Sequence, residues 1–120
     1  MNVGHRVLIV DDHPSFRATA KVLLEAEGFI VVGEAADGNS AITEICRLRP
    51  EVVLLDIGLP DLDGFEVCSK LNGYRGDLPA VILCSSRDAT DFGSIVNRCG
   101  ARGFVPKAEL SGERLEALLS

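Results

Sequence analysis

The stretch VVLLDIGLPDLDG, from Val52 to Gly64, shows what kind of fold this chain adopts. Its first four residues are apolar and two are β-branched, which is typical of a strand buried on both faces of a parallel sheet. Asp56 follows directly, and a carboxylate in that place is costly to desolvate unless it has a partner. The stretch therefore predicts a buried strand that carries an acidic group at its end.

Similar apolar runs recur along the chain and alternate with stripes of helical period. Strands are expected at Val7–Val10, Ile30–Val32, Val52–Leu55, Ala80–Cys84 and Gly103–Val105. The helical stripes are Phe16, Ala20, Leu23 and Leu24; Ala41, Ile42, Ile45 and Cys46; Phe65, Cys68 and Leu71; Phe92, Ile95, Val96 and Cys99; and Leu115, Leu118 and Leu119. Five β-α units in sequence favour an α/β fold, a flavodoxin-like (βα)5 doubly wound parallel sheet with strand order 2-1-3-4-5.

Residues with special backbone preferences mark the helix ends. Helix starts or stops are expected at Pro14, Gly28, Pro50, Gly100 and Ser111. We interpret the Asp37–Gly38 and Asp63–Gly64 pairs as turns.

The length and charge restrict the range of functions. The 120 residues fit one domain, 1–120, with no output domain in the chain. The start of the sequence does not resemble a signal peptide and no apolar run reaches about 20 residues, so a cytoplasmic protein is expected. A net charge of −6 argues against direct binding to nucleic acid or to an anionic membrane.

The cysteines and histidines suggest no metal site of the zinc type. None of the cysteines forms a C-x-x-C pair, and we expect buried, reduced thiols at Cys46, Cys68, Cys84 and Cys99. His5 and His13 are isolated in the sequence, which gives zinc little support, and His13 is expected at the surface.

Polar residues follow the predicted strands. In a parallel sheet all carboxyl ends meet at one edge, and ligands bind there at the point where the strand order reverses, here between strands 1 and 3. The residues expected at this edge are Asp11, Asp12, Asp56, Ser85 and Lys107.

Three carboxylates at close range require a cation, and oxygen ligands favour Mg²⁺ or Mn²⁺. A metal ion, a lysine and a hydroxyl around one carboxylate form a site for a transferred phosphoryl group. Asp56 stands alone and central, so we predict that it attacks phosphorus, whereas Asp11 and Asp12 suit metal binding. The alternative for the Asp11–Asp12 pair is a helix N-cap ahead of Pro14.

Four segments then resemble the receiver domains of two-component response regulators, the CheY-like superfamily. They are VLIVDDH (7–13), VVLLDIGLPDLDG (52–64), VILCSS (81–86) and GARGFVPK (100–107). The DDH start and the ADG at 36–38 resemble receivers of the NarL/FixJ type, which often precede a helix-turn-helix DNA-binding domain.

The resemblance implies roles for individual residues. It implies that Asp56 is the phosphoacceptor and that Asp12, Asp56 and the backbone carbonyl of Gly58 bind Mg²⁺. Asp11 would assist through water. Lys107 would contact the phosphoryl group.

The resemblance also implies a switch. Ser85 would be the switch hydroxyl and Phe104 the switch aromatic, although plain core packing is the alternative for Phe104. Gly58 and Arg87 would tune the lifetime of the phosphoryl group. One departure from the family pattern is Pro106, which precedes the lysine instead of following it, so the turn after the last strand is expected to differ.

The predicted function is a signalling switch that a sensor histidine kinase phosphorylates and that changes its helix 4–strand 5–helix 5 face to control a partner. Homodimerisation through that face, or through helices 1 and 5, is a hypothesis, and a DNA-binding output requires a longer chain. An enzyme that turns over substrate is not expected. The alternatives are a Mg²⁺-dependent aspartyl-phosphate phosphohydrolase and a flavin or nucleotide carrier, and the acidic loop after strand 1 disfavours the carrier because it repels phosphate.

Overall fold

The computed structural model describes residues 4–62, 64–71, 79–85 and 101–119, without the side chains of residues 64, 65 and 68. Several predictions fall outside this description. They are the turn residue Asp63, the apolar positions Phe65 and Cys68, the motif residue Ser86, the lifetime residue Arg87, the stripe Phe92, Ile95, Val96 and Cys99, and the cap Gly100.

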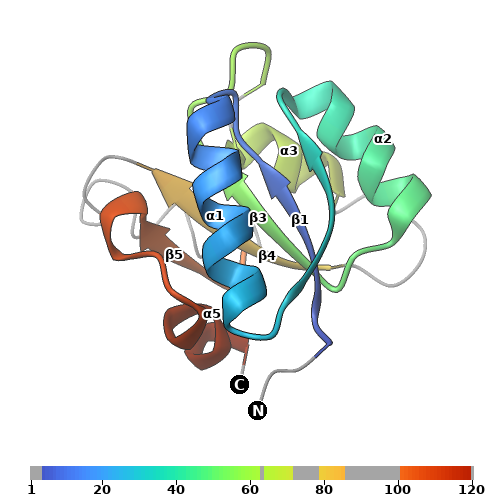
Figure 1. Cartoon of the computed structure of the whole chain (residues 1–120). Helices are drawn as coiled ribbons and strands as arrows, with labels where there is room; N and C mark the ends of the chain where they lie inside the picture. The colour runs from blue at the N-terminus through green and yellow to red at the C-terminus, as the bar shows by residue number, and fades with distance from the viewer. Residues whose placement is uncertain (1–3, 63, 72–78, 86–100, 120) are drawn as a thin grey trace.

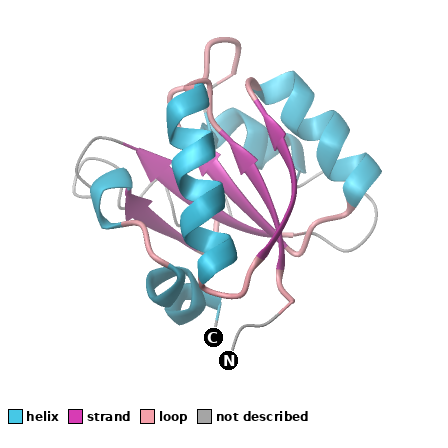
Figure 2. Cartoon of the chain, viewed as in Figure 1, coloured by secondary structure: helices cyan, strands magenta, loops and turns pink. Residues whose placement is uncertain are grey.

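A five-stranded parallel sheet forms the centre of the molecule, in the order β2-β1-β3-β4-β5 (Figures 1 and 2). This confirms the predicted topology. The strands are β1 (Arg6–Val10), β2 (Ile30–Ala35), β3 (Val52–Asp56), β4 (Ala80–Ser85) and β5 (Gly103–Pro106). The helices are α1 (Pro14–Ala26), α2 (Gly38–Leu48), α3 (Gly64–Leu71) and α5 (Gly112–Leu119), with a 3₁₀ turn, η2, over Lys107–Glu109.

Helices cover both faces of the sheet, and each face has its own apolar core. Alternate residues of a strand point to opposite faces. Leu8 and Val10 of β1 pack with α2 and α3, whereas Val7 and Ile9 pack with α1 and α5. The whole of β3 is buried, as the opening stretch predicts.

The second strand differs from the prediction of a strand buried on both faces. β2 lies at the edge of the sheet and extends three residues beyond Val32 to Ala35. Ile30 is 50% exposed, and of this strand only Ala35 is buried. The apolar run is thus explained by β propensity and partial packing on β1 rather than by full burial.

The helix ends confirm most of the expected caps. Pro14 occupies the first turn of α1, and Gly28 has φ +95°, the left-handed conformation that follows a helix end. α2 ends at Leu48 before Pro50. The hydroxyl of Ser111 accepts a hydrogen bond of 3.1 Å from the backbone N–H of Arg114.

The predicted turn at Asp37–Gly38 is wrong, and Gly64 of the second predicted turn is helical, while its partner Asp63 lies outside the described residues. Asp37 is the N-cap of α2, where its carboxylate accepts a hydrogen bond of 2.7 Å from the N–H of Ser40, and Gly38 is the first helical residue. Gly64 likewise begins α3. An aspartate before a glycine suits a helix start as well as a turn, and the following apolar stripe decides between them.

The cysteine prediction is correct for Cys84 and wrong for Cys46. Cys84 is buried in β4, and burial raises the pKa of its thiol to about 12. Cys46 is exposed, because Ala41 and Ile45 already form the buried stripe of α2 and the next residue points away from it. In the described ranges no helix is long and apolar enough to cross a membrane.

Candidate acidic site at the carboxyl edge of the sheet

The carboxyl ends of four strands bring together most of the polar residues expected at this edge. Asp11 directly follows β1, Asp56 ends β3, Ser85 ends β4 and Lys107 follows β5. The parallel register places these strand ends side by side although the residues are as much as 96 positions apart in the sequence.

Asp56 is the buried acid of the central strand, with 5% of its surface exposed. Its Oδ1 accepts a hydrogen bond of 3.1 Å from the N–H of Gly58, and its Oδ2 lies 3.5 Å from Lys107 Nζ. Burial raises the pKa of Asp56, and the negative charge of Asp11 adds to this effect. The Gly58 N–H and the ammonium group act in the opposite direction but do not outweigh burial.

Asp11 is fully buried and is held from several sides. Its N–H donates to the carbonyl of Ala35 on β2 at 3.0 Å. Its Oδ1 accepts from the N–H of His13 at 2.8 Å, and its Oδ2 lies 2.6 Å from Lys107 Nζ. The guanidinium of Arg17, on α1, donates to its carbonyl oxygen at 2.6 Å.

Lys107 is the cation between the two buried acids. Its burial alone would lower the pKa of the ammonium group, but the close ion pair with Asp11 and the charge of Asp56 outweigh this and raise it. The Nζ also lies 4.6 Å from the centre of the Phe16 ring, a cation–π contact with α1. The lysine is therefore held in its charged form, facing both carboxylates.

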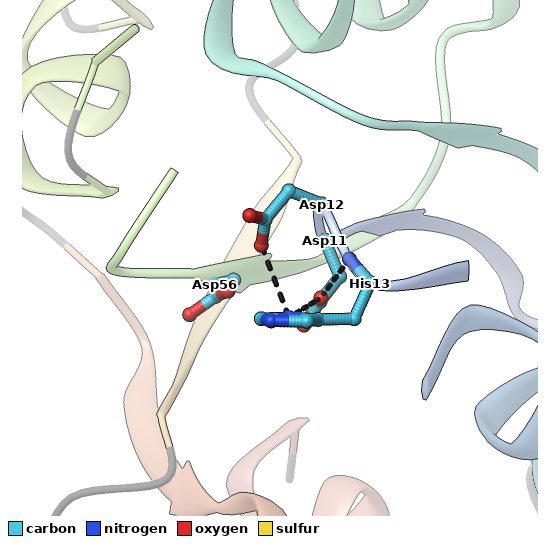
Figure 3. A group of neighbouring side chains, drawn as sticks. All are labelled: Asp11, Asp12, His13 and Asp56. Carbon is cyan, nitrogen blue, oxygen red and sulfur yellow. Dashed lines mark hydrogen bonds and ion pairs between the residues drawn. The ribbon is translucent and has the colours of Figure 1, made fainter. Parts of the chain in front are cut away.

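His13 is exposed, as predicted, but it is not isolated in space, because it lies beside the acidic pair. Its side chain is 65% exposed, yet its Nδ1 lies 3.0 Å from Asp11 Oδ1 and 3.1 Å from Asp12 Oδ1 (Figure 3). Ligand atoms of Asp11, Asp12, His13 and Asp56 all lie within 4.8 Å of one another. His13 is also the N-cap of α1 but forms no side-chain cap, so neither aspartate takes the alternative role of N-cap residue.

The donor set of this acidic cluster fits a divalent cation. Two buried oxygens, Asp11 Oδ2 and Asp12 Oδ1, receive no well-directed hydrogen bond from the described part of the chain. The Lys107 ammonium next to Asp11 balances charge without a hydrogen bond of good geometry. Buried carboxylate oxygens without donors are costly, and a hard cation satisfies them.

Ser85 and Phe104 lie where the sequence predicts them. Ser85 is 7% exposed at the end of β4, next to the register position of Asp56, which pairs with Cys84. Phe104 pairs with Leu83 and is half-buried against the core on the α2–α3 face. Pro106 pairs with Ser85, and the chain then enters η2 directly, so the turn after β5 is a 3₁₀ turn.

A structural aspartate close to the site, Asp61, was not predicted from the sequence. Asp61 accepts hydrogen bonds from the N–H groups of Gly38 at 2.7 Å, Asn39 at 3.0 Å and Leu62 at 2.8 Å. Two of these donors are at the N-terminus of α2, so Asp61 attaches the loop after β3 to that helix. Its place in the PDLDG motif is the signal that could have indicated a role.

A parallel sheet of this order, with acids after β1 and at the end of β3 facing a lysine after β5, defines the CheY-like receiver class of α/β domains. Comparison with known proteins gives the family. Residues 7–119 match the response regulator receiver domain, and the chain belongs to this family of two-component signalling proteins. This confirms the identification from sequence.

Individual relatives support the same family assignment. The positive alginate biosynthesis regulatory protein of Pseudomonas aeruginosa is 39% identical over 114 residues, which are 93% of this chain and 45% of that protein. The solved two-component response regulator of the LuxR family from Aurantimonas sp. SI85-9A1 superposes with a TM-score of 0.85 at 30% identity, over 95% of this chain and 84% of that one. The response regulator domain of Thermotoga maritima CheB superposes with a TM-score of 0.81 at 27% identity, over 95% of this chain and 92% of that one. The chain spans about half the length of the curated relatives it matches.

Proposed function

We propose that this receiver domain is a phosphorylation switch whose phosphoacceptor is Asp56. The observation that carries the proposal is the buried carboxylate of Asp56, which faces Asp11 and Lys107 at the carboxyl edge of the sheet. Family membership supports it, because receivers are the signalling modules of two-component systems.

The acidic cluster would hold Mg²⁺ or Mn²⁺ through Asp12, Asp56 and the Gly58 carbonyl, with Asp11 acting through water. When bound, the cation neutralises the oxygens of the incoming phosphoryl group. An Asp56 carboxylate oxygen attacks phosphorus, the bond from phosphorus to the donor imidazole breaks, and that nitrogen takes a proton. Lys107 is already charged beside Asp56 and moves its ion pair to a phosphoryl oxygen.

The new group then changes the surface. The Ser85 hydroxyl donates a hydrogen bond to a phosphoryl oxygen, and Phe104 turns into the space that Ser85 leaves. Gly58, next to Asp56, presents no side chain to guide water, and together with Arg87 it would set the lifetime of the phosphoryl group. The face around β5 and α5 would be the one that a partner reads.

The partners are proposed on the same basis. The phosphoryl donor would be a sensor histidine kinase in the cytoplasm. Curated relatives include the DNA-binding response regulator MtrA of Mycolicibacterium smegmatis, 41% identical over 88 residues, 72% of this chain and 37% of that protein. We therefore propose a DNA-binding output in a longer chain as the target of the switch, and homodimerisation as the alternative. We propose a switch rather than a turnover enzyme such as a phosphohydrolase.

The test is phosphoryl transfer from labelled acetyl phosphate with Mg²⁺. Asp56→Asn should incorporate no label while keeping the circular dichroism spectrum of the wild type. Asp61→Asn is the matched control, since this aspartate lies in the loop directly after β3 but faces α2, and the variant should be labelled. Full labelling of Asp56→Asn would show that another group is the phosphoacceptor.

A further inference from the structure

His13 is the only nitrogen ligand among the four residues of the acidic cluster. Its backbone N–H already donates to Asp11 Oδ1, which holds the residue at the start of α1. The ring then lies over the pair of aspartates, with Nδ1 directed at one oxygen of each (Figure 3). With 65% of its side chain exposed, the ring stands where an ion from solvent would enter.

The spacing of these atoms is that of neighbouring ligands around one ion. Ligands about 2.1 Å from an octahedral cation lie about 3.0 Å apart on adjacent corners and about 4.2 Å apart on opposite ones. The Nδ1 atom lies 3.0 and 3.1 Å from the two carboxylate oxygens. The largest separation within the cluster is no more than 4.8 Å.

A hydrogen bond alone does not account for this position of the ring. The contact between Nδ1 and Asp11 Oδ1 has hydrogen-bond geometry. Asp12 Oδ1, by contrast, is buried without a well-directed donor in the described ranges, although Nδ1 is 3.1 Å away. Lys107 is not the partner of Asp12 Oδ1, because its ammonium group lies against Oδ2 of Asp11. An ion between Asp12 and the imidazole would satisfy both groups.

We propose that His13 supplies its Nδ1 as a ligand to the acidic site, so that the site selects a transition-metal dication of the Ni²⁺ or Zn²⁺ kind over Mg²⁺. Imidazole suits these borderline ions, whereas Mg²⁺ prefers oxygen and retains its waters. The ring carries its proton on Nε2 when Nδ1 binds. This inference rests on the proposed function, because the same carboxylates would hold Mg²⁺ during phosphoryl transfer.

The experiment is calorimetric titration of tag-free protein with Ni²⁺ and, separately, with Mg²⁺. The ratio of Ni²⁺ to Mg²⁺ affinity should fall at least about tenfold in His13→Ala, as expected for the loss of a ligand. His13→Gln keeps a hydrogen-bond donor but not the imidazole, and its ratio should fall as well. His5→Ala removes the other histidine, which lies at the start of β1 beside Glu51, and should leave the ratio unchanged.

The outcomes separate this inference from the proposed function. Equal losses of Ni²⁺ and Mg²⁺ affinity in His13→Ala, or a wild-type ratio in His13→Gln, would reduce His13 to a positioning residue and overturn the inference. Electron paramagnetic resonance of bound Mn²⁺ gives a direct readout, because coupling to the histidine nitrogen should disappear in His13→Ala. The proposed function fails on a different result, namely wild-type protein that binds neither ion and takes no label.

Discussion

Two aspartates five residues apart, Asp56 at the end of β3 and Asp61 in the loop that follows, show opposite uses of the same side chain. Asp56 is buried at the end of β3 and has a raised pKa. Asp61, five residues later, is exposed, and hydrogen bonds from backbone N–H groups, first that of Gly38, lower its pKa. Asp56 accepts one backbone hydrogen bond and faces a second negative charge, whereas Asp61 accepts three backbone hydrogen bonds.

The comparison separates a reactive acid from a structural one. A buried carboxylate with a neighbouring negative charge destabilises the folded protein and gains when a cation or a phosphoryl group arrives. An exposed carboxylate at a helix N-terminus stabilises the fold without needing a ligand. The predictions below test this contrast in metal-free protein.

Removal of the Lys107 ammonium group from between the two buried aspartates should have the largest effect on stability. Lys107→Ala leaves Asp11 and Asp56 facing each other, and the free energy of unfolding should fall by about 2 kcal/mol, between the values for exposed and fully buried ion pairs. Urea unfolding with EDTA measures it. The exposed Lys21→Ala is the control, and equal effects of the two substitutions would contradict the ion-pair argument.

Removal of the reactive charge should act in the opposite direction. Asp56→Asn keeps the shape of the side chain and ends the repulsion with Asp11, so the metal-free protein should gain about 1 kcal/mol, the scale of a single buried polar interaction. The same urea titration at neutral pH measures this gain. A clear loss of stability would show that Asp56 is satisfied as an anion and that the contrast with Asp61 is wrong.

The structural aspartate predicts a pH dependence. Since the folded pKa of Asp61 lies below the unfolded value of about 3.9, its contribution is present above that pH and is lost as the pH falls through the folded pKa. The urea midpoint of Asp61→Asn should therefore lie below that of the wild type at neutral pH. The difference should shrink below about pH 4. A difference that does not change with pH would mean that charge is not involved.

Two glycines, Gly58 within this loop and Gly38 at the start of α2 against it, should differ in how well they tolerate an added methyl group. A Cβ on Gly58 would meet only Asp56 Oδ1 at 4.0 Å, so Gly58→Ala should change the free energy of unfolding by less than about 0.5 kcal/mol. A Cβ on Gly38 would lie 2.8 Å from the Leu62 Cβ, and Gly38→Ala should destabilise by about 1 kcal/mol or more. Equal effects would show that α2 and the loop separate without strain.

The local sequence was sufficient for the strand order and for the acids at the sheet edge. Apolar runs and stripes define the period of each element, and a parallel sheet places all carboxyl ends together. This is why Asp11, Asp56 and Lys107 could be predicted as neighbours. The local pattern wrongly predicted that Cys46 and Ile30 are buried, because the burial of a residue depends on which neighbours cover it.

The contacts among the polar groups depend on the three-dimensional fold. The contact of His13 with two carboxylates and the attachment of Asp61 to α2 depend on side-chain directions and on the approach of separate loops. No periodicity in the sequence encodes such contacts. Which residues arrive at the carboxyl edge follows from the local sequence, since backbone hydrogen bonding repeats regularly. The fold decided which donors and charges each of them faces, since those contacts join distant segments through space.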